Sequence, residues 1–145
     1  MKISTKGRYA LRMLIDLAEH NDGSFIALKD IAKRQNISKK YLEQIIPMLN
    51  KSGILRTNRG SQGGYQLAGK PDDYTVGQIL RLTEGALSPV ACVETDLFPC
   101  ERSAECFMHP VWQGLSHVVN EYLDGITLQD IIDKQKDREA NNYVI

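Results

Sequence analysis

The chain has 145 residues, of which 42% are hydrophobic and 25% charged, and this composition is typical of one globular domain with a buried core. No apolar run approaches the ~20 residues that a membrane-spanning helix needs, and the first six residues lack the apolar segment of a secretory signal. We therefore expect a cytoplasmic protein with no membrane partner. Its three cysteines, an odd number, argue against a disulfide framework.

Charge is divided unevenly along the chain. Residues 1–70 carry 13 Lys and Arg against 5 Asp and Glu, whereas residues 71–145 carry 5 against 13. The net charge of zero therefore hides a basic half of +8 and an acidic half of −8. A basic half can neutralise phosphates and release counterions, which favours a nucleic-acid partner, but ordinary segregated surface charge would look the same.

Residues 1–70 predict three helices followed by a β-hairpin. The first helix runs from Ser4 or Thr5 to the turn at 21–23, the second is closed by the turn at 34–37, and the third is capped by Ser38 and ended by Gly53. Pro47 falls inside the third helix, where it removes one backbone hydrogen bond and predicts a kink or a loosened last turn. Residues 54–57 and 65–67 are typical of two strands around the glycine-rich turn 60–64.

This order of elements is typical of a winged helix-turn-helix, a mainly α fold with a small β wing. We assign residues 1–70 to the DNA-binding domain. Residues 71–145 are assigned to a linker helix opened by a Thr75-x-x-Gln78 capping box, a cysteine-bearing loop at 86–109, a helix at 110–123, and a short final helix. The polar tail from Lys136 is expected to be mobile.

The helix at 110–123 carries an apolar stripe with the spacing of a coiled-coil seam. The stripe can be core of the same chain or a self-complementary dimer face. Because a helix-turn-helix generally reads two half-sites, we expect a homodimer. The residues expected at its interface are Trp112, Leu115, Val118, Val119 and Tyr122.

The third helix is predicted to read an operator in double-stranded DNA. If its apolar residues face the core, Lys39, Lys40, Glu43 and Gln44 face outward near its start, where base edges are within reach. On the wing, Arg59 suits a narrow minor groove, and the glycines, Gly63 among them, allow close approach to the sugar–phosphate chain. Candidate phosphate contacts at the start of the first helix are Lys2, Lys6 and Arg8. Any one of these charges can equally be a solvated side chain.

Four soft or borderline ligands lie within eighteen residues: Cys92, Cys100, Cys106 and His109. Structural zinc usually takes paired ligands two to four residues apart, and only the Cys106/His109 pair fits that spacing, which disfavours zinc. Iron–sulfur clusters use thiolates on longer loops, and imidazole can replace thiolate. An iron–sulfur cluster, a zinc site and a thiol switch all stay open from spacing alone.

Three segments resemble the IscR-type regulators, a family that also includes NsrR and CymR. They are Met1–Tyr9, Tyr41-Leu42-Glu43-Gln44, and the wing motif Arg59-Gly60-x-x-Gly63-Gly64-Tyr65-x-Leu67. The resemblance covers nearly the whole chain and implies a winged-helix homodimer with a long dimerisation helix. It also implies DNA contacts at Lys40, Glu43, Gln44 and Arg59.

Within this family, the Cys-Cys-Cys-His set resembles the IscR type, which carries a 2Fe–2S cluster and regulates iron–sulfur assembly genes. The resemblance implies ligand roles for Cys92, Cys100, Cys106 and His109, in a loop two residues longer than in the enterobacterial type. Arg8 stands where NsrR-type sensors recruit an acidic ligand, and CymR-type regulators of cysteine metabolism lack the cysteine set. We therefore expect a repressor that senses cluster or redox status, with a CymR-like or thiol- or zinc-dependent regulator as the alternative.

Two rival classes are weaker. A thiol redox enzyme or electron carrier would leave the basic half unexplained, and the chain has no Cys-x-x-Cys motif. In the second rival class, zinc is a structural staple and the protein works as a protein-interaction module. We do not expect an enzyme.

Overall fold

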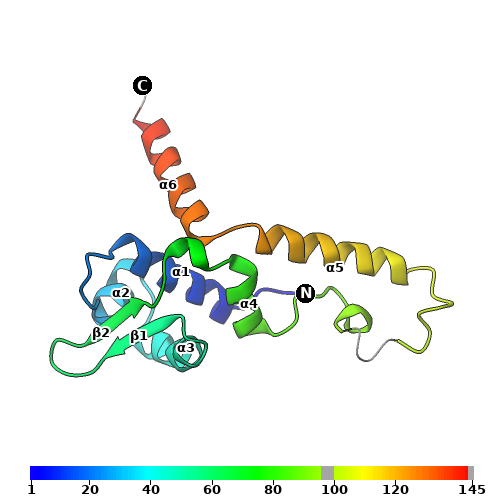
Figure 1. The fold of residues 1–145 in the computed structure, drawn as a ribbon, viewed down its shortest axis with the longest axis horizontal. Helices are drawn as coiled ribbons and strands as arrows, with labels where there is room; N and C mark the ends of the chain where they lie inside the picture. Colours follow the sequence, from blue (N-terminus) through cyan, green and yellow to red (C-terminus); the bar gives the residue numbers. More distant parts are fainter. Residues whose placement is uncertain (96–99, 144–145) are drawn as a thin grey trace.

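The computed structural model describes residues 1–95 and 100–143. A body of four helices and one hairpin carries two helices that project from it (Figure 1). The helices are α1 (Thr5–Glu19), α2 (Leu28–Gln35), α3 (Lys39–Lys51), α4 (Val76–Glu84), α5 (His109–Asp124) and α6 (Leu128–Asn142), with short 3-10 turns η1 (Pro71–Asp73) and η2 (Ala91–Val93). The strands are β1 (Leu55–Asn58) and β2 (Gly64–Leu67). The mainly α fold with a small β wing is confirmed.

The helix ends of the body follow from local chemistry. The Ser4 hydroxyl accepts from the N–H of Gly7, and the Ser38 hydroxyl accepts from the N–H of Tyr41, so each serine satisfies one unpaired donor at the start of its helix. Asn36 ends α2 in the left-handed region, with φ 51°. Pro47 lies inside α3 without ending it, and the helix continues for another turn.

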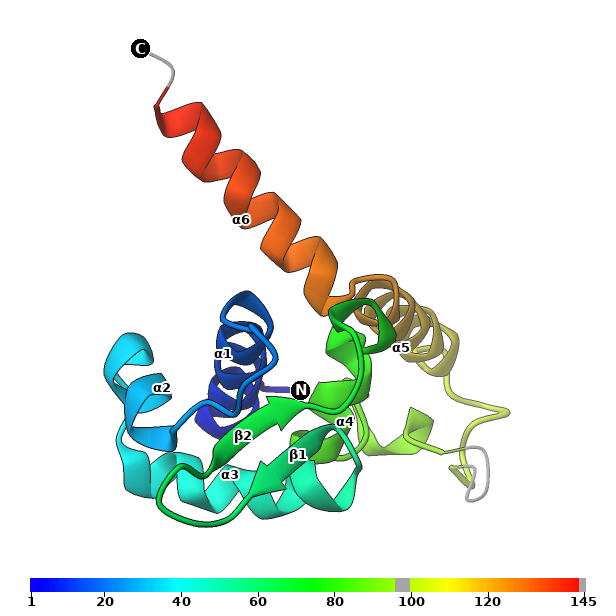
Figure 2. The ribbon, with the colours of Figure 1, turned by 60° about the vertical axis from the view of Figure 1, so that its left-hand side comes forward.

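The two strands form an antiparallel hairpin that lies alongside α3 (Figure 2). Leu55 pairs with Leu67 at the open end and Asn58 with Gly64 at the turn. An isolated bridge between Ile26 and Tyr65 adds a third short rung. A Cβ on Gly64 would collide with the backbone of Ile26, so the close approach of these segments requires glycine there.

The core crosses the boundary expected at residue 70. Fully buried Met13, Leu14, Leu42 and Ile45 pack in one cluster with Tyr74, Ile79 and Leu128. A second, smaller cluster contains Val76, Leu80 and Leu87, with Ile3, Leu123, Ile126 and Ile131 against it. The body therefore includes α4 and the first turn of α6.

The final helix is longer than expected. α6 begins with a complete capping box between Thr127 and Asp130 and runs to Asn142, so the prediction of a short helix with a mobile tail from Lys136 was wrong. Side-chain hydrogen bonds one turn apart, Gln129 to Asp133 and Gln135 to Glu139, stabilise a helix that buries little. In Figures 1 and 2 it leads away from the body to the C-terminus.

None of the helices in residues 1–95 and 100–143 combines the length and hydrophobicity that crossing a bilayer requires.

Candidate nucleic-acid interface and cysteine segment

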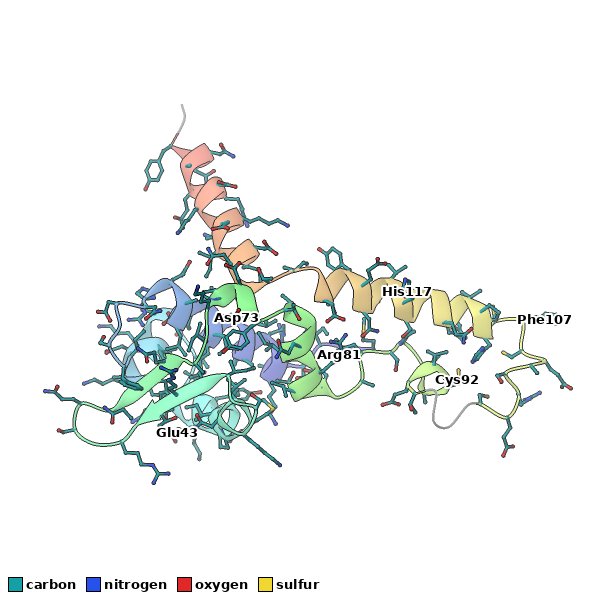
Figure 3. The ribbon with its side chains drawn as sticks, viewed as in Figure 1. Glu43, Asp73, Arg81, Cys92, Phe107 and His117 are labelled. Carbon is teal, nitrogen blue, oxygen red and sulfur yellow. The ribbon has the colours of Figure 1, made fainter. Side chains whose placement is uncertain are left out.

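A groove of about 630 Å³ lies between α3, the start of α2 and the hairpin. Four of the predicted DNA-contacting residues line it: Lys39 and Glu43 from α3, and Arg59 and Gly63 from the wing. In Figure 3, Glu43 lies on the same side of the body as the hairpin. One helix and the hairpin thus bring these residues together although they lie 24 positions apart at the extremes.

Lys29 and Asn50 also line the groove, and sequence reasoning missed both. Asn50 follows Glu43 by seven residues, which is two helical turns, and that spacing could have placed it on the same face. Its side-chain oxygen accepts a hydrogen bond from the Thr57 hydroxyl at 2.9 Å, which ties the end of α3 to β1. Lys29 lies in the first turn of α2 and adds a third cation to the groove, opposite the single carboxylate of Glu43.

The other predicted contacts lie outside this groove. Lys40 and Gln44 are exposed on α3. Lys2, Lys6 and Arg8 lie at the start of α1, where the N–H and hydroxyl of Ser4 both donate to Glu84 at the end of α4. The N-terminal segment is therefore held by α4 rather than by the wing.

Gly63 has an internal reason to be glycine. Its N–H donates to the carbonyl of Gly60 at 3.0 Å, and a Cβ on Gly63 would collide with the carbonyl oxygen of Asn58. Gly60 has φ 125°, a backbone conformation that other residues rarely adopt. The tight turn of the wing therefore accounts for these two glycines without any partner.

The four candidate ligands lie in two pairs. Cys92 and His109 line one hollow of about 390 Å³ beneath α5, and Cys100 and Cys106 line another of about 410 Å³ nearer the tip of the loop. His117, whose side chain is 76% exposed, lines the first hollow too. Figure 3 shows Cys92 below α5, with Phe107 at the far end of the molecule.

The donor chemistry of three thiols and an imidazole fits an iron–sulfur cluster, but this arrangement does not assemble one. Among the residues that the structure describes, no group of three or more His, Cys, Asp or Glu lies close enough to hold a metal ion. Residues 96–99, which belong to the predicted ligand loop, lie outside the described residues. The geometry of the described residues therefore supports two separate pairs of candidate ligands and not a closed ligand set.

α5 presents an apolar stripe to solvent. None of its residues is buried, and Val111, Leu115, Val118 and Tyr122 are 43–66% exposed. Trp112 and Val119 of the predicted seam are half-buried. Relative to the predicted seam, the exposed stripe is therefore rotated around the axis of α5 by about one residue. The reason is that the opposite face of this helix packs on the second core cluster through Leu123.

The other side of α5 is tied to α4 by charge. The Arg81 guanidinium donates to the Asp124 carboxylate, and this hydrogen bond holds the pKa of Asp124 below its ordinary value and that of Arg81 above. Asn120 bridges further, because its amide donates to the carbonyl of Leu87 at 3.0 Å. The segment that enters the cysteine loop is therefore fastened to the same face of α5.

Comparison with known families decides what kind of protein this is. The sequence profile of the Rrf2 family, described as an iron-dependent transcriptional regulator, matches residues 3–134. The chain belongs to the Rrf2 family. It is a transcriptional regulator of the helix-turn-helix type and not an enzyme.

Relatives within the Rrf2 family include proteins named CymR and proteins named IscR. The chain is 41% identical over 131 residues to the transcriptional regulator CymR of Bacillus subtilis, covering 90% of this chain and 89% of the relative. It is 36% identical over 132 residues to IscR of Aliivibrio salmonicida, covering 91% and 77%.

Solved structures of Rrf2 proteins confirm the winged-helix fold. CymR, the global cysteine regulator of B. subtilis, superposes with a TM-score of 0.76 at 38% identity, covering 92% of this chain and 98% of that one. T. potens IscR superposes with a TM-score of 0.73, also at 38% identity, covering 95% and 90%. The family and the role of transcriptional regulator are thus established. Which signal this member responds to is a separate question.

Proposed function

We propose that this Rrf2 regulator binds operator DNA as a homodimer, with α3 in the major groove and the β1–β2 wing against the minor groove. The observation that carries the proposal is the groove in which Lys39, Glu43 and Arg59 lie together. Lysine and arginine neutralise phosphates, whereas a carboxylate repels them unless a base offers a donor such as the amino group of cytosine. The groove therefore combines sequence-independent attraction to phosphates with discrimination between bases.

The exposed stripe on α5 supplies the dimer. Apolar side chains spaced three and four residues apart over three turns suit a self-complementary helix pair, and a two-fold axis would set two copies of α3 against two half-sites. Recognition helices of such dimers stand about 34 Å apart, one turn of DNA. Residues 1–70 would supply the reading surface and residues 71–145 the dimer and the sensor.

A dimer bound over a promoter excludes other proteins, so we propose that this regulator is a repressor. Because it acts on chromosomal DNA, we place it in the cytoplasm.

We propose that the cysteine segment is the sensor. Cys92, Cys100, Cys106 and His109 would hold a 2Fe–2S cluster, whose gain or loss changes the charge and the order of the segment between α4 and α5. Support comes from the donor set and from the similarity to IscR proteins. The regulated genes would then include those for iron–sulfur assembly. The pairwise arrangement of the ligands means that gathering them needs movement of the 100–106 segment.

The DNA-binding proposal is tested by a salt titration. Arg59→Ala should weaken binding to the tightest duplex that the wild-type protein selects from a random library, and it should lower the slope of log affinity against log salt by about 1. An unchanged affinity would remove the wing from the interface.

The sensor proposal is tested by the visible spectrum of protein purified without oxygen. Charge-transfer bands that bleach in air, together with iron and sulfide, would support it. A colourless protein after anaerobic reconstitution would contradict the cluster and favour a thiol- or zinc-dependent regulator of the CymR kind.

A further inference from the structure

A polar network links α1 to the turn that precedes α3. The carboxylate of Asp16 on α1 is completely buried and accepts two hydrogen bonds from Arg34, at 2.7 and 3.0 Å, and one from Gln35, at 3.0 Å. Arg34 and Gln35 are the last two residues of α2, and only Asn36 and Ile37 separate them from the cap of α3. The network therefore holds the C-terminal end of α2 in position against α1.

Arg12 extends this network to α3. Its guanidinium donates to the side-chain oxygen of Gln35 at 3.2 Å and to the main-chain oxygen of the same residue, and it lies 5.3 Å from the centre of the Tyr9 ring. Tyr9 meets Tyr41 of α3 edge to face, with ring centres 5.2 Å apart and planes at 76°. Cation–π and edge-to-face contacts are both directional attractions. Arg12 thus joins the end of α2, through α1, to the first turn of α3.

We propose that Arg12 is a positioning residue that sets the direction of the first turn of α3 and thereby the discrimination between operator and unrelated DNA. The inference rests on the proposed function. Hydrogen bonds of the Glu43 and Gln44 side chains with base edges depend on the angle at which α3 enters the groove. Contacts of lysines with phosphates tolerate a small rotation, because phosphates line the whole duplex and carry no sequence information.

The rival explanation is that Arg12, an exposed cation, itself contacts a phosphate. The two explanations predict different losses. A phosphate contact adds to the affinity for every duplex and to the salt dependence, whereas a positioning role adds only to the affinity for the operator.

The experiment compares Arg12→Met with Gln35→Met, which retains the charge of Arg12 but removes its side-chain acceptor. Affinities are measured across a salt range for the selected duplex and for a scrambled duplex of the same composition. Both variants should lose about tenfold on the selected duplex, with the scrambled duplex and the salt slope unchanged. The double variant should lose no more than the larger single loss, because both changes break one network.

Arg8→Met provides the comparison, since Arg8 lies one turn earlier on α1 and donates to Thr5 outside this network. It should weaken both duplexes and reduce the slope. Equal losses on both duplexes for Arg12→Met, or a smaller slope, would overturn the positioning role, as would an unchanged affinity for the selected duplex. A wild-type protein that prefers no duplex would refute the proposed function itself. Urea unfolding of each variant separates loss of fold from loss of discrimination.

Discussion

Arg81 on α4 places its two terminal guanidinium nitrogens against the two carboxylate oxygens of Asp124 on α5, each at 2.7 Å. The same guanidinium donates to the side-chain oxygen of Asn120 at 2.6 Å. A bidentate pair of this kind has a fixed geometry as well as an attraction. It therefore sets the angle at which α5, and with it the exposed apolar stripe and the cysteine segment, leaves the body.

We expect Arg81→Met to lower stability at neutral pH by no more than about 1 kcal/mol, because both partners are partly exposed and solvent screens them. The pair lowers the pKa of Asp124. Its stabilisation is therefore fully present above the ordinary Asp pKa of about 3.9 and is lost as the pH falls through the lower value of the folded state. Urea unfolding of the wild type and the variant should differ at pH 7 and converge as the pH falls through the lowered pKa of Asp124.

Arg138→Met, on the exposed part of α6, is the matched control and should leave both curves unchanged. A difference between wild type and Arg81→Met that persists undiminished in acid would mean that the arginine stabilises by packing and not by charge.

Glu43→Ala should reduce discrimination between duplexes while raising the affinity for unrelated DNA. The reason is that the carboxylate repels phosphates and is compensated only by a base donor. Each correct base contact is worth about 1–3 kcal/mol of discrimination. The measurement is the ratio of affinities for the selected and scrambled duplexes at one salt concentration.

Lys39 lines the same groove, so Lys39→Ala is the comparison for Glu43→Ala. It should weaken both duplexes nearly equally. If Glu43→Ala left the ratio intact, α3 would not present this residue to the bases.

If the exposed stripe is the dimer face, Leu115→Glu should give a monomer that keeps its fold, since Leu115 contributes to this stripe and not to the core. Burying a carboxylate against its two-fold copy is unfavourable. Light scattering after size exclusion gives the mass. Gln113→Glu, which lies on the face toward the Cys92 hollow, is the control and should stay dimeric. A Leu115→Glu protein of dimer mass would place the interface elsewhere.

His109→Ala and His117→Ala separate the two imidazoles that line the Cys92 hollow. If His109 is the cluster ligand, its removal, like Cys92→Ala, should abolish the visible bands after anaerobic reconstitution without changing the unfolding curve. His117→Ala should keep the bands, because His117 lies two helical turns further along α5 and pairs with Glu121. The opposite result would exchange their roles.

Local sequence signals predicted most of the body correctly. Ser4 and Ser38 were recognisable as caps because their hydroxyls satisfy donors three residues away, within the same segment. Gly53 was recognisable as a helix end, and it has a positive φ. α6 was misjudged at Lys136 because polarity was taken for disorder, although lysine, glutamine, glutamate and arginine all favour helix.

Long-range relationships needed the tertiary structure. The spacing of Cys92, Cys100, Cys106 and His109 could not show that they fall into two hollows, because that depends on how η2 packs under α5. The apolar stripe on α5 was visible in the sequence. Which face of α5 is exposed was decided by contacts on the opposite face of this helix, where Asp124 pairs with Arg81 of α4 and Leu123 packs on the second core cluster.

The sequence by itself determined the fold class, since caps, helical periodicity and the glycine turn of the wing are all local and together specify a winged helix. Only the tertiary structure showed that Asn50 and Lys29 join the DNA groove and that Asp16, Arg12 and Tyr41 form one connected network. The physical reason is the same for the groove and for the network. Hydrogen bonds and ring contacts between residues far apart in the chain depend on where helices cross, and crossing is set by core packing that no single segment contains.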